Sequence, residues 1–465
     1  MLFDYNAFWV EDLYDYVLYT GDLALAAQVW PNLVELIDGW YPAQMGADGL
    51  LVNSLGPSDY GFIPRAGTTV AYYNAGYVLA LRQAAQLAAW IGQDAQAAAW
   101  TGRIAPIAAV FSGAFWDARA GAFVDATSGP VVHPEDATAF AVLAGLATPS
   151  RGREALDYLS WHDSQPYGAA IADNDTWDGY PWGSGASQRV YPFMSYFEVL
   201  ARYAVGFDAS ALALIRREWG TMLENGPKST MWETIGPGGK APVGENPSWD
   251  HGWSSGAAPA LTNEVLGVTP ATPGFASFSA APHPSDLAWA RGAVPTPHGS
   301  IELAWSHSGK MFTVKVDSPV SGTITLPLAG TVVRDGRTVG SRPAGALVPV
   351  SAGVHTVAVV TRRTARPRRD RAGANRGLRL KEEPSSSRGV RPSGASASRL
   401  ARQPAMRSPR SRSRTAMLRA LPLSSYAEPT STKPRRNGAI AGLDVMGREG
   451  FEPSTLGLRV PCSTN

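Results

Sequence analysis

The sequence predicts a mainly α-helical fold, an α/α-toroid that is incomplete at its N-terminus, followed by a small β-sandwich. Three observations carry this prediction. Apolar side chains recur at helical spacing through residues 4–266, short alternating strands replace them up to about residue 360, and neither period continues after Thr361. We therefore expect three segments, a toroid over 1–267, a β-sandwich over 268–360 and a disordered basic tail over 361–465.

In the first helix, Phe8, Trp9, Leu13, Tyr16 and Val17 recur at helical spacing, and Thr20-Gly21-Asp22 ends it and caps the next helix. Pro31 forces a break or kink in that second helix, because proline has no amide hydrogen to donate. The predicted helices after the first cover 22–45, 67–91, 94–111, 134–147, 151–162, 187–205, 208–225 and 254–266.

Short turns join these helices in pairs, whereas long loops rich in Gly, Pro and Trp separate the pairs. This pairing favours a toroid over a simple bundle. The loops at 49–66, 164–186 and 226–252 hold the polar and aromatic residues that a functional site needs. A toroid of six hairpins has twelve helices, and the sequence predicts about nine. Because the chain also begins in mid-helix, we expect a domain that is truncated at its N-terminus.

Between Thr269 and about Val360 proline and glycine become frequent, and the side chains alternate between apolar and polar. The clearest predicted strands are 301–305, 311–316, 322–326 and 355–359. Short strands at regular spacing, with turn residues between them, are typical of a β-sandwich.

The tail differs from the rest of the chain in charge. From Thr361 onward it holds 23 Lys and Arg and 7 Asp and Glu, which leaves 18 basic and 32 acidic residues in 1–360. Its few large apolar side chains cannot offset the entropy of ordering, so we expect disorder. Its arginines are scattered without aromatic partners, so we expect no nucleic-acid binding. The last residues resemble the ends of mispredicted bacterial reading frames, which favours non-native read-through.

Composition also bears on membrane association and on redox environment. No run of about eighteen apolar residues is present, so we expect no transmembrane helix. The first residues do not form a signal-peptide pattern, and the compartment, bacterial cytoplasm or secretion, stays open. Cys462 is the only cysteine, so no disulfide framework is expected.

All fifteen tryptophans lie before residue 306, in the acidic part of the chain. Flat indole faces stack on sugar rings, and carboxyl groups supply the acid and base of glycosidic hydrolysis. The alternative is that these tryptophans pack between helices. Three stretches combine aromatic and acidic residues in loops, namely Ser58-Asp59-Tyr60-Gly61-Phe62, the run from Asp173 to Trp182, and Thr230-Met231-Trp232-Glu233 with the cluster from Trp249 to Trp253.

The first two stretches also have structural interpretations. Asp59 fits a helix cap or a turn as well as a sugar contact. The Asp173–Trp182 run, which includes Trp177, resembles a calcium-binding loop or a structural acidic loop in its Asp spacing, although no Glu stands at its end.

The third stretch carries the stronger chemical prediction. Glu233 follows Trp232 directly, and His251 can hydrogen-bond a sugar hydroxyl or orient a carboxylate. Glu245 lies closer to His251 and is a competing base, but its Gly-Glu-Asn-Pro surroundings indicate a surface turn.

Several motifs in order resemble bacterial α-L-rhamnosidases of glycoside hydrolase family 78. They are Leu18-Tyr19-Thr20-Gly21-Asp22-Leu23, the Ser58–Phe62 loop, TMWE at 230–233, WDHGWSSG at 249–256, Val265-Leu266-Gly267-Val268, Pro273-Gly274-Phe275, Ala281-Pro282-His283-Pro284 and Gly292–Gly299. The resemblance covers about residues 5–360. It implies a six-hairpin catalytic domain with a C-terminal β-sandwich, and inverting hydrolysis of terminal α-L-rhamnosides by a water held between two acids.

The resemblance also implies roles for single residues. Glu233 falls at the position of the catalytic general base, and His251 at that of a substrate-contacting histidine. Asp59 with Tyr60 falls where relatives have Asp-Trp lining the sugar pocket. Further sugar contacts are expected at Trp177, Trp182 and Trp232. The implied partner is a carbohydrate, with no metal, cofactor, nucleic acid or membrane, and the oligomeric state stays open.

The chain departs from the family pattern in one respect. The family carries its general acid in a motif that ends in Gly-Trp-x-Gly-Asp, and no such stretch occurs in these residues. We therefore expect little or no activity from this chain alone, since one positioned acid contributes roughly 10²–10⁴-fold. The alternatives are another toroidal glycosidase or phosphorylase, a non-catalytic sugar-binding remnant, and a pseudogene product that aggregates through unpaired helix faces.

Overall fold

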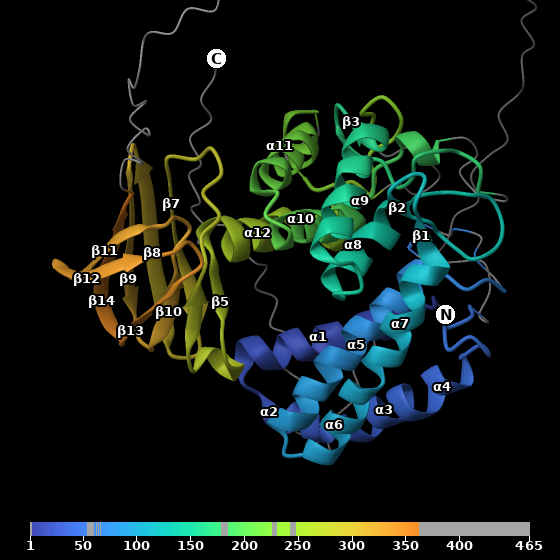
Figure 1. Cartoon of the computed structure of the whole chain (residues 1–465), viewed down its shortest axis with the longest axis horizontal. Helices are drawn as coiled ribbons and strands as arrows, with labels where there is room; N and C mark the ends of the chain where they lie inside the picture. Colours follow the sequence, from blue (N-terminus) through green and yellow to red (C-terminus); the bar gives the residue numbers. More distant parts are fainter. Residues whose placement is uncertain are drawn as a thin grey trace, which may run out of the picture. The chain divides into compact units, whose positions relative to one another are not determined.

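The computed structural model describes residues 2–361 apart from 54–59, 62, 64, 66, 178–184, 226–229 and 242–247. Within these residues, helices occupy the chain up to Leu266, and the two larger sheets follow from Val268 (Figure 1). The described helices and strands fall in one compact unit. None of the described helices is long and apolar enough to cross a bilayer.

The helical part contains twelve α-helical elements among the described residues, joined by tight turns or by long loops. They are α1 (Tyr5–Thr20), α2 (Leu23–Gln28), α3 (Trp30–Val34), α4 (Tyr41–Ala43), α5 (Ala71–Trp90), α6 (Asp94–Gly102), α7 (Ile104–Phe115), α8 (Glu135–Leu143), α9 (Pro149–His162), α10 (Pro192–Ala204), α11 (Asp208–Asn225) and α12 (Ala257–Ala260). Two π-helical turns, Glu35–Trp40 and Leu261–Leu266, continue α3 and α12.

Prolines account for two differences from the predicted helix bounds. The helix predicted over 22–45 is interrupted at Val29, which places Pro31 in the first turn of α3. The helix predicted over 94–111 is divided at Arg103 into α6 and α7, which places Pro106 in the first turn of α7. A proline is tolerated there because the first amide groups of a helix have no carbonyl partner within the helix.

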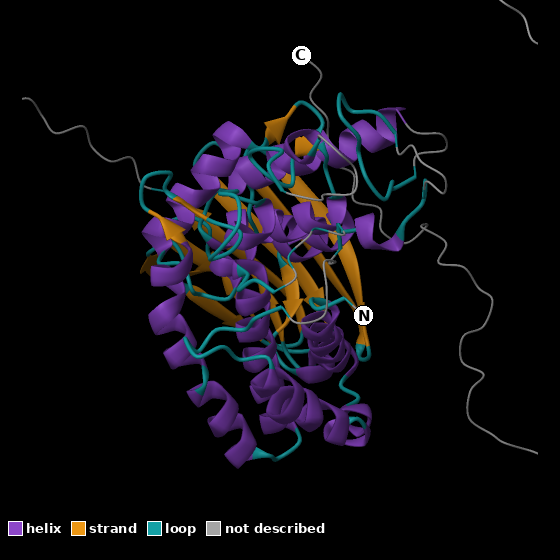
Figure 2. Cartoon of the chain, turned by 90° about the vertical axis from the view of Figure 1, so that its right-hand side faces the viewer, coloured by secondary structure: helices purple, strands orange, loops and turns teal. Residues whose placement is uncertain are grey.

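The long helices contact one another in sequence. α1 packs on α5, α5 on α8, α8 on α10, and α10 on α12. Each of the first four also contacts the helix that follows it along the chain, so that α2, α6, α9 and α11 act as their partners. Figure 2 shows the helical part, in purple, in front of the orange strands of the larger sheets. Asp22 caps α2 as predicted, since its Oδ1 accepts the amide of Leu25 at 3.0 Å.

Two short hairpins lie within the helical part, and two larger sheets follow it. The hairpins pair β1 (Trp116–Asp117) with β2 (Ala122–Phe123), and β3 (Ser164–Gln165) with β4 (Gly168–Ala169). The remaining strands are β5 (Val268–Pro270), β6 (Phe278–Ala280), β7 (Trp289–Thr296), β8 (Gly299–Ser308), β9 (Met311–Ser318), β10 (Gly322–Thr325), β11 (Gly330–Arg334), β12 (Arg337–Arg342), β13 (Leu347–Val350) and β14 (Gly353–Val360).

The two larger sheets have the orders β13-β10-β6-β5 and β12-β11-β14-β9-β8-β7. Alternate side chains of these strands are buried, as in β8, where Ile301, Leu303 and Trp305 are at most 2% exposed. These residues belong to one apolar cluster with inward residues of the other sheet, such as Ile324 and Val348.

The passage from helices to strands depends on Gly267. Its φ of +86° is left-handed, and a Cβ there would lie 2.4 Å from the amide nitrogen of Pro282. Only glycine fits this close approach of two backbone segments. Nearby, the Trp305 indole donates to the carbonyl of Val265 at 2.9 Å, which ties β8 to the last helical turn.

Three glutamates are buried inside the helical part. Glu135 of α8, Glu198 of α10 and Glu218 of α11 are at most 1% exposed, and Glu198 forms an ion pair with Arg202. Burial raises the pKa of Glu218 to about 8. Burial, followed by repulsion from Glu198, raises the pKa of Glu135 well above its ordinary value. The folded protein therefore binds protons that the unfolded chain releases.

This proton uptake predicts a stability that falls as pH rises. The pKa of Glu218 is about 8 in the folded state and near 4.5 in the unfolded chain. Between these two pH values, Glu218 therefore lowers the unfolding free energy by up to about 1.4 kcal/mol for each pH unit. We expect Glu218→Gln to flatten the dependence of the unfolding free energy on pH in this window. Urea unfolding at about pH 5 and about pH 8 measures it. The exposed Glu224→Gln is the control, and parallel wild-type and Glu218→Gln curves would contradict the prediction.

Candidate functional site

The segment that holds Glu233 and the segment that holds His251 pair through their backbones near the end of the helical part. The amide of Glu233 donates to the carbonyl of Ser248 at 3.1 Å, and the amide of His251 donates to that of Met231 at 2.8 Å. The Trp253 indole adds a bond of 3.1 Å to the carbonyl of Glu233. These bonds bring the predicted base and the predicted substrate-contacting histidine into one site.

The carboxyl group of Glu233 is left available by this arrangement. Its backbone is held on both sides, yet its side chain is partly exposed and makes no hydrogen bond or ion pair with the described residues. Trp249 lies on the same paired segment with 37% of its surface exposed. Trp232 is fully buried behind it, with ring centroids 5.7 Å apart and planes at 74°. Trp232 therefore supports the exposed indole from behind.

The geometry around His251 fixes which ring nitrogen carries the proton of the neutral side chain. The amide of Trp253 donates to Nδ1 of His251 at 3.3 Å, so Nδ1 is the acceptor and Nε2 bears the hydrogen. The His251 and Trp253 rings lie 4.5 Å apart, and Trp253 stacks on Phe193 at 5.1 Å. His251 thus presents one hydrogen-bond donor above a stacked aromatic surface.

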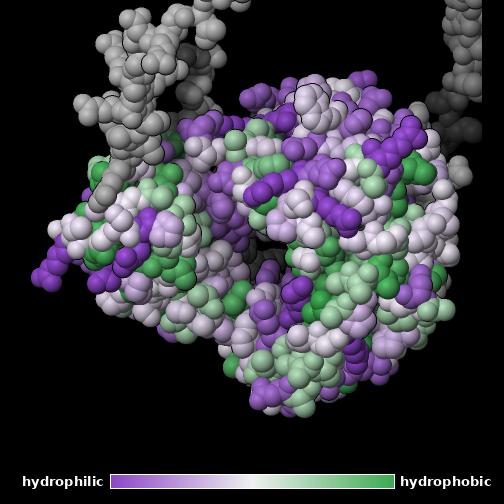
Figure 3. All heavy atoms as spheres, in the orientation of Figure 1, coloured by the Kyte–Doolittle hydropathy of each residue, from purple (hydrophilic) through white to green (hydrophobic). Residues whose placement is uncertain are grey.

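A groove of about 570 Å³ adjoins these rings, between α1 on one side and α10 and α12 on the other. We call it the α1–α10 groove. Its lining residues are Tyr5, Phe8, Trp9, Glu11, Asp12, Asp15, Phe193, Tyr196, Phe197, His251, Trp253, Ser255, Gly256 and Pro259. Figure 3 shows the surface hollowed here, with hydrophilic side chains on the α1 side. The groove and the paired segments share His251 and Trp253.

The other predicted aromatic contacts lie around Arg65, which is 1% exposed. Arg65 pairs with Asp125 at 2.7 Å and with Asp136 at 2.8 Å. The Tyr60 hydroxyl donates to Asp136 at 3.3 Å, and the Trp177 indole donates to Asp125 at 2.9 Å. Because Tyr60 and Trp177 are only 3% and 6% exposed, they offer a ligand little surface.

Phe193, at the start of α10, connects the Arg65 cluster to the paired segments. Its ring lies 5.9 Å from Tyr60 and 5.1 Å from Trp253. The structure therefore brings Tyr60, His251 and the backbone of Glu233 to the same end of the helices, although Tyr60 lies one aromatic layer below the surface. Asp59, Trp182 and the competing base Glu245 lie outside the described residues.

Sequence reasoning missed Arg65, Asp125 and Asp136, which are isolated in the sequence and carry no motif. It also missed the role of His133, whose two ring nitrogens contact Asp173 at 2.9 Å and Asp117 at 3.2 Å. Burial alone would lower the pKa of His133, but these carboxylates outweigh it and raise the pKa.

The acidic loop that begins at Asp173 is therefore held by a histidine. The Oδ2 of Asp173 also accepts a hydrogen bond from the Tyr158 hydroxyl at 2.8 Å. No group of three or more metal-binding side chains occurs among the residues that the structure describes.

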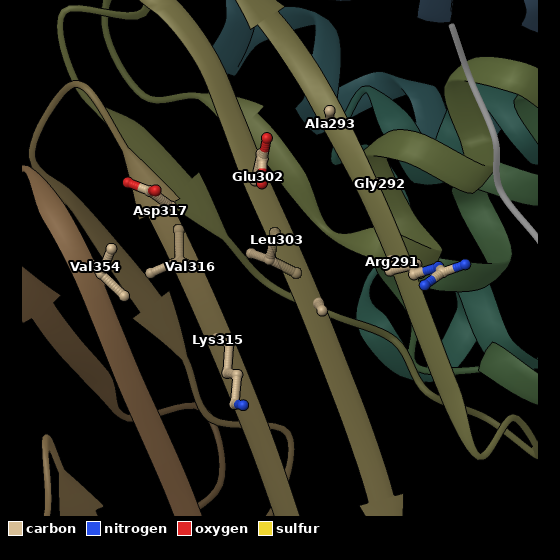
Figure 4. A pocket seen from close by; sticks show the side chains of 10 residues that line it. Arg291, Gly292, Ala293, Glu302, Leu303, Lys315, Val316, Asp317 and Val354 are labelled. Atoms are coloured by element: carbon tan, nitrogen blue, oxygen red, sulfur yellow. The ribbon is translucent and has the colours of Figure 1, made fainter. Parts of the chain in front are cut away.

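A second hollow, of about 470 Å³, lies on the sheet formed by β7, β8, β9 and β14. Figure 4 shows Arg291, Glu302, Lys315 and Asp317 on this face, with Ala293 and Val354 beside them. None of the residues in this hollow belongs to the predicted site.

A family model for the bacterial α-L-rhamnosidase C-terminal domain matches residues 267–341. No curated protein matches the sequence. Among solved structures, a rhamnosidase of Bacillus sp. GL1 is 27% identical, with a TM-score of 0.54 over 66% of this chain and 31% of its own.

Two further solved structures share the fold. The α-L-rhamnosidase of Dictyoglumus thermophilum is 15% identical, with a TM-score of 0.57 over 76% of this chain and 39% of its own. The α-L-rhamnosidase of Streptomyces avermitilis, complexed with L-rhamnose, is 17% identical, with a TM-score of 0.55 over 73% of this chain and 31% of its own. The chain thus spans between 31% and 39% of the length of these structures. By these matches the chain is similar to rhamnosidases of glycoside hydrolase family 78.

Proposed function

We propose that this chain is the C-terminal part of an inverting α-L-rhamnosidase, and that Glu233 is its general base. The observation that carries the proposal is the position of Glu233. Its backbone is fixed by Ser248 and Trp253, while its carboxyl group has no partner among the described residues. The matched rhamnosidases supply the substrate class.

The proposed architecture is an N-terminally incomplete toroid over 1–267, a β-sandwich over 268–360 and a non-native tail over 361–465. Support for the toroid comes from the succession of contacts α1–α5–α8–α10–α12, each of the first four with a partner helix. Support for the sandwich comes from the apolar cluster that the two larger sheets share.

In the proposed reaction, the carboxylate of Glu233 takes a proton from water as the water oxygen bonds to the anomeric carbon. The glycosidic C–O bond breaks, and the departing oxygen takes a proton from a second acid. We infer that this acid is not among residues 1–465, because the Gly-Trp-x-Gly-Asp motif is absent from them.

Sugar contacts are assigned by exposure and by hydrogen-bonding capacity. The exposed indole of Trp249 supplies a stacking face, and Nε2 of His251 supplies a donor for a hydroxyl group. Trp232 positions Trp249 from behind. Tyr60 and Trp177 lie in the buried layer beneath these residues, where Trp177 packs against Arg65 and Tyr60 donates to Asp136, an ion-pair partner of Arg65. Direct sugar contact by Tyr60, Trp177, Trp232, Asp59 and Trp182 stays a prediction.

Binding of the sugar can be tested apart from catalysis. We expect L-rhamnose to bind the chain in the millimolar range, and Trp249→Ala and His251→Ala each to weaken binding about tenfold. Calorimetric titration measures the affinity. Trp161→Ala is the matched control, because Trp161 is an indole on α9 that is 85% exposed. Equal losses in the Trp161 and Trp249 variants would argue against the assignment.

Catalysis is tested with two leaving groups. A 4-nitrophenolate departs without a proton, so 4-nitrophenyl α-L-rhamnoside does not require the missing acid, whereas an alkyl rhamnoside does. We expect slow turnover of the aryl substrate, no detectable turnover of the alkyl one, and a loss of roughly 10²–10⁴-fold in Glu233→Gln. Rhamnose affinity should change little in this variant.

Three results would revise the proposal. Aryl turnover that survives Glu233→Gln would remove Glu233 from the reaction. Sugar binding without any turnover would indicate a non-catalytic remnant. Preference for another aryl glycoside, or a requirement for phosphate, would indicate another toroidal enzyme.

A further inference from the structure

Helix α1 buries part of its apolar surface against the described residues but leaves a stripe of large aromatic side chains exposed. Val10, Leu13 and Val17 are at most 7% exposed. On a neighbouring stripe of the helix, Tyr5, Trp9 and Tyr16 are 46%, 37% and 43% exposed. A helix that is apolar on several faces is typically packed on several faces. The exposed stripe borders the α1–α10 groove, which includes Tyr5 and Trp9.

The floor of this groove is apolar. Phe8 of α1 lies 5.2 Å from Phe193 and 5.7 Å from Phe197, both on α10. Trp253 and Pro259 continue the apolar surface on the opposite wall. Such a surface is stabilised when another apolar side chain removes it from water.

Three carboxyl groups line the same groove without a positive partner. Glu11, Asp12 and Asp15 make no hydrogen bond or ion pair with the described residues. Burial, followed by repulsion from Asp15 and Asp12, raises the pKa of Glu11 to about 8, although the side chain keeps some exposure. Desolvation, followed by repulsion from Asp12, raises the pKa of Asp15 to about 6, although Asp15 is exposed by surface area. A positive charge placed here would offset the repulsion between these carboxylates.

We propose that the α1–α10 groove is the docking surface for an amphipathic helix that carries lysine or arginine among its apolar side chains. The groove is bordered by helices and runs along α1 from Tyr5 to Asp15, which is about 15 Å or three helical turns. Its volume of about 570 Å³ accommodates the side chains of one helical face.

The position of the charges sets the chemistry of the occupant. Glu11 and Asp15 are four residues apart and so lie on adjacent turns of one face of α1. One lysine or arginine that enters between them reaches both carboxyl groups. Because none of the described residues supplies this cation, the helix comes from outside them. The inference does not depend on the proposed hydrolysis.

The test uses the full chain and two synthetic peptides of about 15 residues, helical and alike in their leucine and alanine positions. One carries lysines on the apolar face, and the other carries glutamates at the same positions. Calorimetric titration measures their affinities. We expect the lysine peptide to bind at least about tenfold more tightly.

Two changes should remove this preference. The first is the double variant Glu11→Gln with Asp15→Asn, which deletes the charges. The matched control is Asp94→Asn with Glu224→Gln, at exposed positions on α6 and α11, and it should keep the preference. The preference should also fade as pH falls to about 5, because the raised pKa values leave Glu11 and Asp15 neutral there.

Five outcomes would overturn the proposal. Equal affinity for both peptides, absence of binding, or a preference that survives Glu11→Gln with Asp15→Asn would each remove the charge-matched helix. Self-association of the chain that this double variant abolishes would instead assign the groove to a second copy. L-Rhamnose binding that depends on Glu11 would assign the α1–α10 groove to the sugar. The effect of Trp249→Ala on rhamnose binding would still test the proposed sugar site separately.

Discussion

The buried guanidinium of Arg65 is the interaction on which the site end of the helical part depends. It neutralises Asp125 and Asp136, two carboxylates that are at most 5% exposed. Removing one member of such a buried group leaves an uncompensated charge, which is more costly than any exposed ion pair. Asp125 also accepts the Trp177 indole, and Asp136 accepts the Tyr60 hydroxyl. The loops before α5 and α8 are thereby fixed relative to each other.

An aromatic layer extends this fixed point to the proposed base. Tyr60 contacts Phe193, Phe193 stacks on Trp253, and the Trp253 indole donates to the carbonyl of Glu233. Every contact in this series holds the backbone or a ring, and none uses the carboxyl group of Glu233. A rigid backbone with a free functional group is what pre-organised chemistry requires, because positioning is then achieved before the substrate arrives.

The α1–α10 groove meets the proposed sugar site at His251 and Trp253. A helix docked along α1, as proposed, would lie beside these two residues. This arrangement connects two features of the chain, the exposed aromatic stripe on α1 and the absence of the expected acid motif.

The sequence by itself determined the local elements and their order. Periodicity located α9, α11 and strands such as β8 and β9, and Asp22 was recognised as a cap, because these features depend on neighbours within a few residues. It also pointed to Glu233 and His251 through their motifs. Only the tertiary structure joined those two segments, and only it placed Tyr60 and Trp177 against Arg65 rather than on an open surface. Their partners, Asp125 and Asp136, lie some 50 or more residues away along the chain. No local pattern encodes which buried charges will meet, because that pairing is set by how whole helices pack.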